Sequence, residues 1–533
     1  MSADSTERWP AKLGFVAALT LVSLLAYWPG MDGEMVSDDH NAIVNNEFVS
    51  GKLLTIFTKP SWWGSARGDA PGYRPVTTLT FALNHRVGGI SPRGYHVTNL
   101  FVHVLVCCLV MAVGGALGMS GRASASAAAV FALMPVHSEA VLWVVGRAEL
   151  LAAAGFLAGL LAILRYRQGG PAWLLGAAAL ALAAGILAKE NAMALLVAPP
   201  LLATVLPNGQ GRRRRDLWAF VALLAGFAAA WWLRAEVAGH LLGASGGDEL
   251  DNPLAGLPLD GRLAGALSVL GRYLWLIVWP HPLSADYSYN ALAIGPGFIA
   301  DRYSAAGLAG LATVVAVVCR ARRMPVPAFC VLMAGACYAI VSNVLVPIGT
   351  IMGERLFYLP SAGLSLAVAP ALARALGTRP RKAGLAAALV ATAWLAVNID
   401  RSRDWTDPVR LFSSAVTAQP RAARARMELG SAYGHAGMAA KALVEFDQAL
   451  DIYPGYMSAW YNRANLLARE GRYEDAALSY LRAIEIVGNF EPAWFNLGLT
   501  RHLQGRETDA AKALGRATQL RQAAKVATRS TGR

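Results

Sequence analysis

Long apolar runs alternate with short polar connections over the first 400 residues of the chain. A helix that crosses a membrane needs about 20 mostly apolar residues. Eleven runs approach this length: 12–29, 97–118, 123–142, 148–164, 172–188, 191–206, 217–234, 303–319, 326–347, 356–373 and 383–399. The pattern predicts an all-α fold whose first part is a polytopic bundle of transmembrane helices.

Two apolar stretches need a separate interpretation. The stretch 263–280 carries Arg272 in its middle, and we expect it to lie at the membrane interface or to re-enter the membrane. The first run ends in Tyr27-Trp28-Pro29, which resembles an interfacial aromatic anchor, and no small-residue cleavage site follows it. We therefore expect the first run to be an uncleaved membrane anchor.

The basic connections predict an orientation, because cytoplasmic loops carry an excess of Lys and Arg. With the N-terminus in the cytoplasm, all of them face the cytoplasm provided that 263–280 does not cross. These connections hold Arg122, Arg165 with Arg167, Arg212–Arg215, Arg320–Arg323 and Arg374–Lys382. An odd number of crossings then places the C-terminal region on the extracytoplasmic side, where we expect the tail to lie.

Composition supports the membrane interpretation. Only 15% of the residues are charged, 55% are hydrophobic and the mean hydropathy is +0.40, whereas a soluble domain has roughly 25% charged residues. This excludes an ordinary soluble enzyme and a disordered chain. The formal net charge of +14 is typical of a nucleic-acid binder, but most of it falls in the cytoplasmic loops, so we expect no nucleic-acid partner. Five cysteines exclude a disulfide scaffold.

The C-terminal tail repeats with a period of 34 residues. Equivalent positions are Trp460 and Trp494; Gly437, Gly471 and Gly505; Ala442, Ala476 and Ala510; Ala449, Ala483 and Ala517. This is the period of the tetratricopeptide repeat, a pair of antiparallel helices with small residues where they touch. The tail is therefore predicted to be an α-solenoid that either acts as a scaffold or binds peptide or protein.

These patterns divide the chain into four parts. We expect a membrane domain over 1–400, a linker and half repeat over 401–421, three repeats over 422–521 and a basic, disordered tail over 522–533. The membrane domain would hold eleven or twelve spans, and its longest outer loop would cover about 30–95.

Two adjacent carboxylates, Asp38 and Asp39, follow the first span. Such a pair can act as a general base or hold a cation, although Asp is also common in solvated turns. His96 and His103 lie one heptad apart and share a helix face as the chain enters the second span. Polar residues in a span usually face the bundle interior or a cavity.

Further polar clusters fall on the same predicted outer face. They include His137 and Glu139, Arg147, Lys189 with Glu190, Tyr287, and Glu354 with Arg355 and Tyr358. Residues that only snorkel to the interface would scatter over both faces, so this convergence predicts one outward site. The basic members, with Arg74, would suit a phosphate or diphosphate at headgroup level. No phosphate-binding loop of the Gly-x-x-x-x-Gly-Lys type and no His-Glu-x-x-His zinc motif is present.

The motifs and their order resemble the TMTC-type (transmembrane and tetratricopeptide repeat-containing) protein O-mannosyltransferases, within the GT-C class of membrane glycosyltransferases. The matching segments span about 14–365: Asp38-Asp39, Tyr73-Arg74-Pro75, His96 to His103, Pro135-Val136-His137-Ser138-Glu139-Ala140, Arg147-Ala148-Glu149, Lys189-Glu190-Asn191 and Glu354-Arg355 to Tyr358-Leu359-Pro360-Ser361. The short array and the Arg-rich composition favour a bacterial member.

The resemblance implies an enzyme that transfers a sugar, typically mannose, from a polyprenyl-phosphate sugar to Ser or Thr hydroxyls at the outer face, with inversion. It assigns the catalytic base to Asp38 or Asp39 without separating them, and the donor phosphate to Arg74, Arg147, Lys189 and Arg355. Glu139 and Glu354 would orient these cations, and the supporting residues would be His96, His103, His137, Glu190, Tyr287 and Tyr358. The resemblance favours a metal-free reaction, although a divalent cation is compatible with the carboxylate pair.

Two other functions fit parts of the sequence. A non-catalytic membrane scaffold would need only the repeats, and a transporter or polymerase of lipid-linked sugars would need the outer cations without a base at Asp38 or Asp39. In all three cases we expect a multi-pass protein of the inner (cytoplasmic) membrane.

Overall fold

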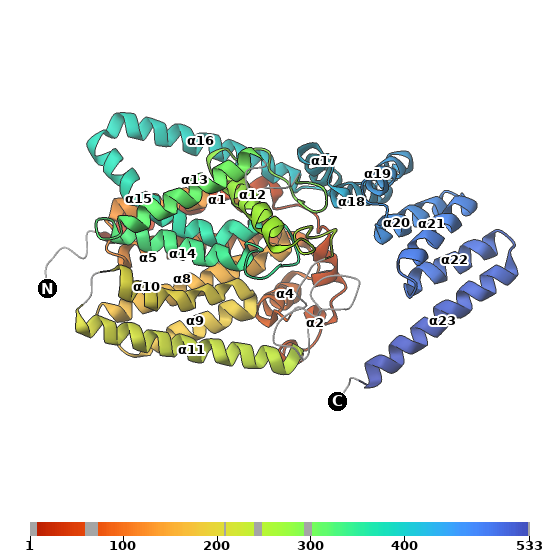
Figure 1. Ribbon diagram of the computed structural model, residues 1–533, viewed down its shortest axis with the longest axis horizontal. Helices are drawn as coiled ribbons and strands as arrows, with labels where there is room; N and C mark the ends of the chain where they lie inside the picture. The colour runs from red at the N-terminus through yellow and green to blue at the C-terminus, as the bar shows by residue number, and fades with distance from the viewer. Residues whose placement is uncertain (1–7, 59–72, 207–208, 239–247, 293–300, 531–533) are drawn as a thin grey trace. The chain divides into compact units, whose positions relative to one another are not determined.

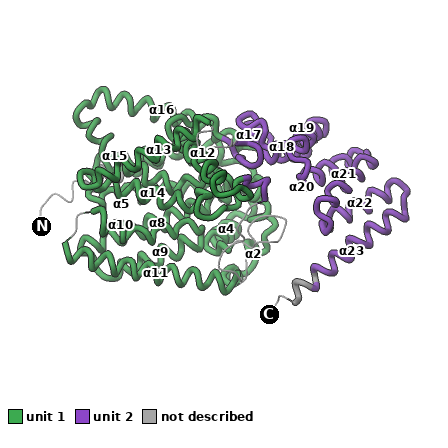
Figure 2. The backbone as a smooth tube through the Cα atoms, viewed as in Figure 1, with its two compact units in different colours: residues 1–247, 254–283, 294–407 green, residues 248–253, 284–293, 408–533 purple. Residues whose placement is uncertain are grey.

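The computed structural model describes residues 8–58, 73–206, 209–238, 248–292 and 301–530. Within these residues the fold is all-helical, with no strand, as predicted (Figure 1). The chain divides into two compact units (Figure 2). Unit 1 comprises 1–247, 254–283 and 294–407, and unit 2 comprises 248–253, 284–293 and 408–533.

Unit 1 is the apolar helical bundle. Its longer helices are α1 (Arg8–Tyr27), α4 (Pro75–Gly88), α5 (Pro92–Ala116), α6 (Gly121–Leu133), α8 (Arg147–Arg167), α9 (Trp173–Ala188), α10 (Ala198–Val205), α11 (Gln210–Ala238), α12 (Leu259–Val278), α13 (Arg302–Cys319), α14 (Pro325–Val341), α15 (Tyr358–Thr378) and α16 (Pro380–Asp404). Its short elements are η1 (Trp28–Gly30), η2 (His40–Val44), α2 (Glu47–Ser50), α3 (Thr55–Thr58), η3 (Pro135–His137), α7 (Ser138–Leu142), η4 (Val144–Gly146), η5 (Glu190–Val197) and η6 (Glu354–Phe357).

Each of the eleven predicted apolar runs coincides with a helix or a pair of helices. Among the described residues, seven helices are long and apolar enough to cross a membrane, or eight if the bent pair formed by α6 and η3–α7 counts as one span. That pair bends by 56° at Pro135, whose missing N–H interrupts the helix ladder. Together with four shorter apolar helices, these elements indicate a multi-pass membrane protein.

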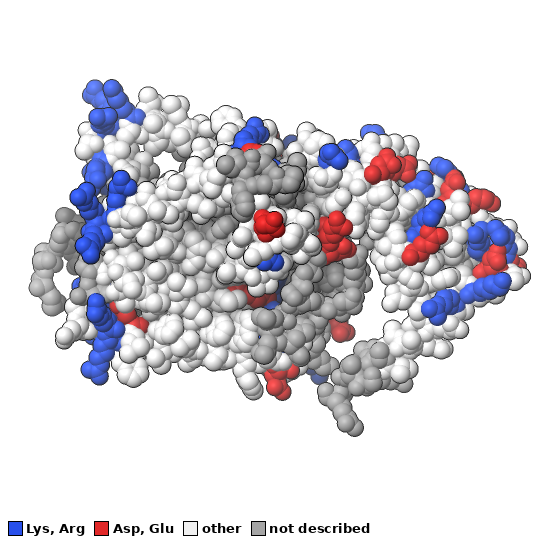
Figure 3. All heavy atoms as spheres, viewed as in Figure 1, with Lys and Arg blue, Asp and Glu red and all other residues white. Residues whose placement is uncertain are grey.

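The surface of unit 1 is consistent with contact to lipid. Large apolar side chains are exposed on its long helices, among them Trp173, Leu180, Trp232, Val315 and Leu385. Figure 3 shows a broad face almost without charge, with Lys and Arg gathered at one end of the bundle. The first turns of α11, which carry Arg212 to Arg215, and the turn from α15 to α16 lie at that end (Figure 1).

Helix α12 is one of the seven candidate spans, although the sequence favours an interfacial position for it. That expectation rests on the charge of Arg272. In the structure this charge has partners. Its guanidinium lies 3.3 Å from Asp301 and 4.1 Å from the centroid of the Tyr303 ring. A paired arginine is compatible with a helix inside a bundle, so Arg272 is no argument against a crossing.

Unit 2 contains the repeat array. Its helices are α17 (Pro408–Ala418), α18 (Ala423–His435), α19 (Ala439–Ile452), α20 (Met457–Arg469), α21 (Tyr473–Ile486), α22 (Glu491–Leu503) and α23 (Glu507–Ser530). The equivalent glycines 437, 471 and 505 have φ angles of 74°, 75° and 73° and end α18, α20 and α22, because glycine adopts this left-handed conformation without a steric cost. Helix α23 continues to Ser530, across most of the stretch 522–533 that the sequence predicts to be disordered.

Two short segments from the N-terminal side of the array complete unit 2. The amide of Tyr289 donates to the carbonyl of Leu250 (2.7 Å), and the amide of Ala423, the first residue of α18, donates to the carbonyl of Tyr289 (2.9 Å). Arg424 pairs with Asp251 at 2.8 Å. The first repeat is therefore built against 248–253 and 284–292, which the 34-residue period gave no reason to expect.

Candidate active site

The two carboxylates of the first outer loop have different surroundings. Asp39 is completely buried, and its carboxylate accepts hydrogen bonds from the amides of Val36 (3.1 Å) and Val145 (3.0 Å). Burial raises the pKa of Asp39 to about 8, although these backbone hydrogen bonds act in the opposite direction. Asp39 therefore ties the loop to the connection between α7 and α8.

Asp38 is the carboxylate of the pair that can reach a ligand. It is partly exposed, and it follows Ser37, whose φ of 48° lies in the left-handed region. Non-glycine residues rarely adopt this conformation, and here it turns the chain sharply between Val36 and Asp38. The charge of Asp38 also acts on Arg355. The part of this loop at 59–72 lies outside the described residues.

Side chains from six separate segments of unit 1 form a group of ion pairs, which we call the charged cluster. Its members are Arg74, Glu139, Glu149, Lys189, Glu190, Arg234 and Arg355. Glu190 pairs with both Arg74 (3.3 Å) and Arg234 (2.7 Å). Lys189 pairs with Glu149, and Arg355 pairs with Glu139.

The cluster is one electrostatic unit. The charges of Arg74 and Arg355 both act on Lys189, and that of Glu149 acts on Arg355. The acids are held firmly: Glu139 accepts the backbone amide of Arg355 (2.8 Å), and Glu149 accepts the side-chain amide of Asn191 (2.7 Å). The glutamates thus fix the positions of cations that would otherwise repel one another.

Several cations of the cluster remain accessible. The side chains of Arg74, Lys189 and Arg355 are 20%, 14% and 23% exposed, Glu190 is 25% exposed, and Glu139 and Glu149 are each 1% exposed. An anion approaching the cluster would therefore meet three cations and one glutamate, which is already paired with two arginines. Arg355 also lies 4.5 Å from the centroid of the Trp143 ring, which holds the guanidinium over an aromatic face.

Arg147, the remaining predicted phosphate ligand, has another position. It is completely buried, and its guanidinium donates to Asn99 (2.7 Å), Asn84 (2.5 Å) and the carbonyl of Tyr95 (2.8 Å). It also lies 4.7 Å from the centroid of the Phe81 ring. Its donors are directed into the protein, so Arg147 joins α4, α5 and α8 and is not placed to bind a donor phosphate.

The predicted histidines lie within the bundle. His103 Nδ1 is 2.8 Å from the Tyr358 hydroxyl, and His137 Nε2 is 2.8 Å from Ser361 Oγ. The rings of His103, His137 and Tyr358 pack against one another and against Phe131. His96 is also buried, with Nε2 at 3.2 Å from the carbonyl of Gly33. These residues can position the helices around the site but not contact a substrate.

Two supporting residues lie elsewhere. Glu354 is buried beside Arg355, at the start of η6. Tyr287 belongs to a segment of unit 2, where its hydroxyl accepts from the amide of Ser284 at 3.2 Å. Of the predicted residues, the structure brings Arg74, Glu139, Lys189, Glu190 and Arg355 into the charged cluster.

Arg234 is a member of the cluster that sequence reasoning missed as a site residue. It ends the apolar run 217–234 and is 7% exposed, although it is an arginine. Besides Glu190 it contacts the carbonyl of Tyr73 (3.1 Å). The sequence signal for Arg234 is an arginine at the end of an apolar run, on the same predicted outer side as the other cations.

The geometry defines a class: a multi-pass helical membrane protein with a charged site at one end of its bundle and a tetratricopeptide array after it. A model of the tetratricopeptide repeat matches residues 458–490. The chain is 28% identical over 478 residues to Protein O-mannosyl-transferase F38B6.6 of Caenorhabditis elegans, covering 85% of this chain and 66% of that protein.

Two further relatives carry the same type of name. Protein O-mannosyl-transferase TMTC3 of Mus musculus is 26% identical over 508 residues, covering 88% of this chain and 54% of its own. Protein O-mannosyl-transferase TMTC4 of Homo sapiens is 27% identical over 475 residues, covering 77% and 62%. These homologues confirm the predicted resemblance to the TMTC proteins. The chain spans between half and two thirds of the length of these relatives.

Among solved structures, the crystal structure of MamA aligns with 29% of this chain and 87% of its own, at 18% identity and a TM-score of 0.22. This similarity is too low to support an argument about the fold.

Proposed function

We propose that the protein is an integral-membrane glycosyltransferase that transfers mannose from a polyprenyl-phosphate donor to Ser or Thr hydroxyls of proteins at the extracytoplasmic face. The observation that carries the proposal is the match to relatives named as protein O-mannosyl-transferases over 77% to 88% of this chain. The charged cluster beside Asp38 supplies the groups that such a transfer needs.

Asp38 is the proposed catalytic base. The acceptor oxygen attacks the anomeric carbon while Asp38 takes the hydroxyl proton, and the bond from that carbon to the phosphate oxygen breaks. The polyprenyl phosphate departs with the bonding electrons, and a single displacement of this kind inverts the anomeric carbon. Asp39 is a positioning residue, because it is buried and bonded to backbone amides.

The accessible cations of the cluster stabilise the leaving group. Negative charge develops on the phosphate as the sugar departs, and fixed positive groups at that place lower the barrier. Arg74, Lys189 and Arg355 are the proposed phosphate ligands, since each is partly exposed and oriented by a glutamate. Arg234 holds Glu190 in place at 2.7 Å.

The proposed orientation, in which α12 adds no crossing to the eleven apolar runs, places the N-terminus in the cytoplasm, in an inner membrane, and the repeats on the extracytoplasmic side. It is supported by the basic end of unit 1 (Figure 3). Ser402, near the end of α16, donates to the carbonyl of Tyr27 (3.0 Å) and accepts from the amide of Gly30 (2.9 Å). The chain therefore leaves unit 1 at the end where the first outer loop begins.

The repeat array is the proposed binding element for the protein acceptor. The amide of Asn462 donates to Ser431 Oγ (3.1 Å), and one period later the amide of Asn496 donates to Asn465 Oδ1 (2.9 Å). Helices α18, α20 and α22 thus carry a regular row of polar side chains. Such a row suits the backbone of an extended peptide.

A transfer assay tests the proposed base. Membranes containing each variant would receive polyprenyl-phosphate mannose and a Ser/Thr peptide, and the mannosylated peptide would be measured. We expect Asp38→Asn to lose about 10²- to 10⁴-fold in rate. Glu34→Gln, an exposed carboxylate of the same loop, is the matched control and should stay near wild type. Equal rates for these two variants would remove Asp38 from the mechanism.

A further inference from the structure

The segment between α14 and η6 is an uncharged loop that leads directly into the charged cluster. The apolar run 326–347 continues beyond the end of α14 at Val341. No charged residue occurs over 342–353, and Arg355 follows two residues later. Pro347 lacks an amide hydrogen and disfavours helix at the residue before it. The last part of the apolar run is therefore a loop and not a helix.

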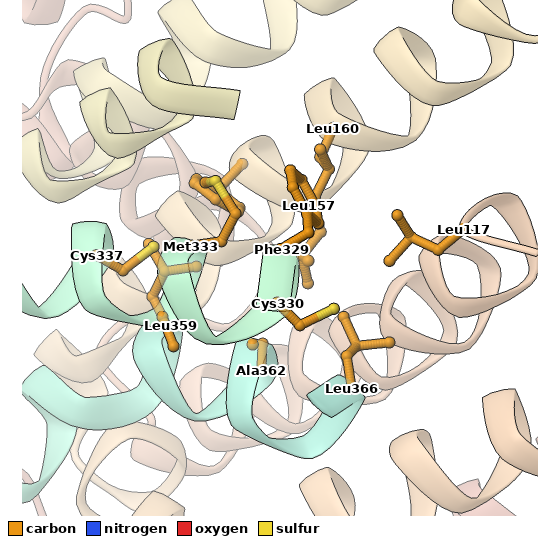
Figure 4. A pocket seen from close by; sticks show the side chains of 13 residues that line it. Leu117, Leu157, Leu160, Phe329, Cys330, Met333, Cys337, Leu359, Ala362 and Leu366 are labelled. Carbon is orange, nitrogen blue, oxygen red and sulfur yellow. The ribbon is translucent and has the colours of Figure 1, made fainter. Parts of the chain in front are cut away.

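Helix α14 is near the lower limit of length for crossing a bilayer. Its 17 residues span about 25 Å, whereas the hydrocarbon core is about 30 Å thick. In Figure 4 its inward side chains meet those of α8 and α15 around one small apolar space; they include Phe329, Met333, Leu157 and Leu359. Because α14 is packed between these neighbours, the remaining distance falls to the loop that follows it.

One buried asparagine shapes this loop. Asn343 is 1% exposed, and its φ of 62° lies in the left-handed region, which asparagine adopts more readily than most residues. Its side-chain amide donates to the carbonyls of Thr350 (3.2 Å) and Ile351 (3.1 Å), and its oxygen accepts from the amide of Ile348 (2.8 Å). Non-helical backbone at membrane depth needs such partners, because lipid supplies none. The base of the loop is therefore closed by bonds that suit an apolar environment.

The middle of the loop, residues 344–348, which we call the apolar tip, presents large apolar side chains outward. Leu345 and Val346 are 68% and 51% exposed, although Ile351 in the same loop is 2% exposed. Neighbouring exposed apolar side chains mark a surface that contacts a protein or a membrane. The loop has no charged side chain that would favour water.

The far end of the loop is fixed to the charged cluster. The Tyr273 hydroxyl of α12 donates to the carbonyl of Gly353 (2.8 Å) and accepts from the amide of the same residue (3.1 Å). The Tyr273 ring also stacks on Phe357 of η6, with the ring centroids 4.8 Å apart. Arg355 lies between these two contacts along the chain, so the loop and Arg355 are positioned together.

We propose that the apolar tip enters the bilayer at the boundary between headgroups and hydrocarbon, at the end of unit 1 that holds the charged cluster. Its partner is the lipid surface, and its insertion fixes the depth of Arg355. Elements in this boundary are buried by about 5–10 Å. Continuity with α14, lack of charge and a closed base favour lipid over a protein partner. The insertion is independent of the function proposed above, and only the effect of depth on donor binding rests on it.

Depth-dependent quenching tests the insertion without sugar transfer. A fluorescent amino acid would replace one of three exposed leucines in the full protein: Leu345 in the tip, Leu311 in the middle of α13, or Leu478 in α21. Phosphatidylcholine vesicles would carry bromine either near the headgroup or near the chain end. At Leu345 we expect shallow bromines to quench about twofold more than deep ones. Leu311 should show the reverse, and Leu478 should show no quenching.

Two results would overturn the insertion. A label at Leu345 that behaves like the label at Leu478 would place the tip in water. A label at Leu345 that is unquenched in vesicles, and whose emission changes only when a Ser/Thr peptide is added, would assign the tip to a protein partner instead.

A charge in the tip tests the link to the cluster. Leu345→Asp should abolish shallow quenching of a label at Val346 and raise KM for a polyprenyl-phosphate sugar about fivefold, with little change in kcat. Leu345→Phe keeps the tip apolar and should keep both values. Equal behaviour of the two variants, or lost insertion with an unchanged KM, would overturn the role of the tip in fixing Arg355. An inserted tip in a protein that transfers no sugar would keep the insertion and reject the proposed activity.

Discussion

The two units differ in where most of their paired charges lie. In unit 1 several ion pairs join residues far apart in sequence and have a buried partner, such as Arg355 with Glu139 and Lys189 with Glu149. In unit 2 many pairs are local, such as Arg472 with Asp475 and Arg482 with Glu485, and both partners are about half exposed or more. Exposed pairs contribute little stability, whereas a buried charge needs its partner. The charges of unit 1 thus specify one arrangement of helices, while the array of unit 2 is specified by its small residues.

The largest effect is expected from the most buried charge of unit 1. Arg147→Met would leave Asn99, Asn84 and the carbonyl of Tyr95 without their donor, at a cost of about 3–5 kcal/mol. The fraction of protein that remains monodisperse after heating in detergent would measure the loss. Arg93→Met, on the same helix as Asn99 but 58% exposed, should change stability by less than about 0.5 kcal/mol. If Arg147→Met were as stable as wild type, the buried charge would not be needed for the fold of unit 1.

The small residues of unit 2 offer the converse test. A β-carbon at Gly430 would lie 2.8 Å from the Phe446 ring, whereas one at Gly434, on the same helix, would meet nothing closer than 3.9 Å. Gly430→Ala should therefore destabilise the first repeat by about 1–3 kcal/mol. Gly434→Ala should stabilise it by up to about 1 kcal/mol, since alanine favours a helix.

Hydrogen exchange of the peptides covering α18 and α19 would separate these two glycines. Faster exchange in Gly430→Ala and slower exchange in Gly434→Ala are the expected results. The same direction of change in both variants would contradict the packing argument.

A smaller effect is expected from a single cation of the charged cluster. Arg74→Gln leaves Glu190 paired with Arg234, so the fold should persist. Loss of one charge-assisted contact to the donor phosphate should raise KM for the donor about tenfold with little change in stability. Arg86→Gln, an exposed arginine of the same helix α4, serves as the control. Unchanged KM in Arg74→Gln would show that Arg74 is structural, like Arg147.

The most local effect concerns the pH dependence of the first outer loop. The pKa of Asp39 is raised to about 8 by burial, above its value near 4 in an unfolded chain. The carboxyl therefore stabilises the folded loop most at low pH, and this contribution is lost as the pH rises towards 8. Exchange of the amides around Val36 should be faster at pH 9 than at pH 6 after correction for intrinsic rates. Asp39→Asn should abolish that difference, and a difference that persisted in this variant would point to another group.

The contrast between the units also explains what could be predicted from the sequence. The helices of unit 2 could be predicted from the 34-residue period of the sequence, and the candidate spans of unit 1 from its apolar runs. The partners of Lys189 and Arg355 could not be derived, because they lie 40 and 216 residues away. Arg147 looked like the other outer cations, and only the surrounding acceptors show its structural role.

Asp38 and Asp39 illustrate the same limit at short range. Adjacent carboxylates are equivalent in the sequence, and burial alone distinguishes them. The amide of Val145 that contacts Asp39 comes from a connection more than 100 residues away. Which carboxylate meets solvent is therefore decided by long-range packing, not by the motif.

Unit 2 is assembled from three stretches of chain, and this limits how the repeat array can be exchanged between genes by recombination. Leu250 and Tyr289 are encoded between membrane helices, yet Tyr289 contacts Ala423 and Tyr453, and Leu250 belongs to the same apolar cluster as Ala423. An array exchanged between homologues at residue 408 would arrive without these matching pieces. Recombination that keeps the first repeat intact must carry both segments with it, so the membrane region and the array are expected to evolve as one gene unit.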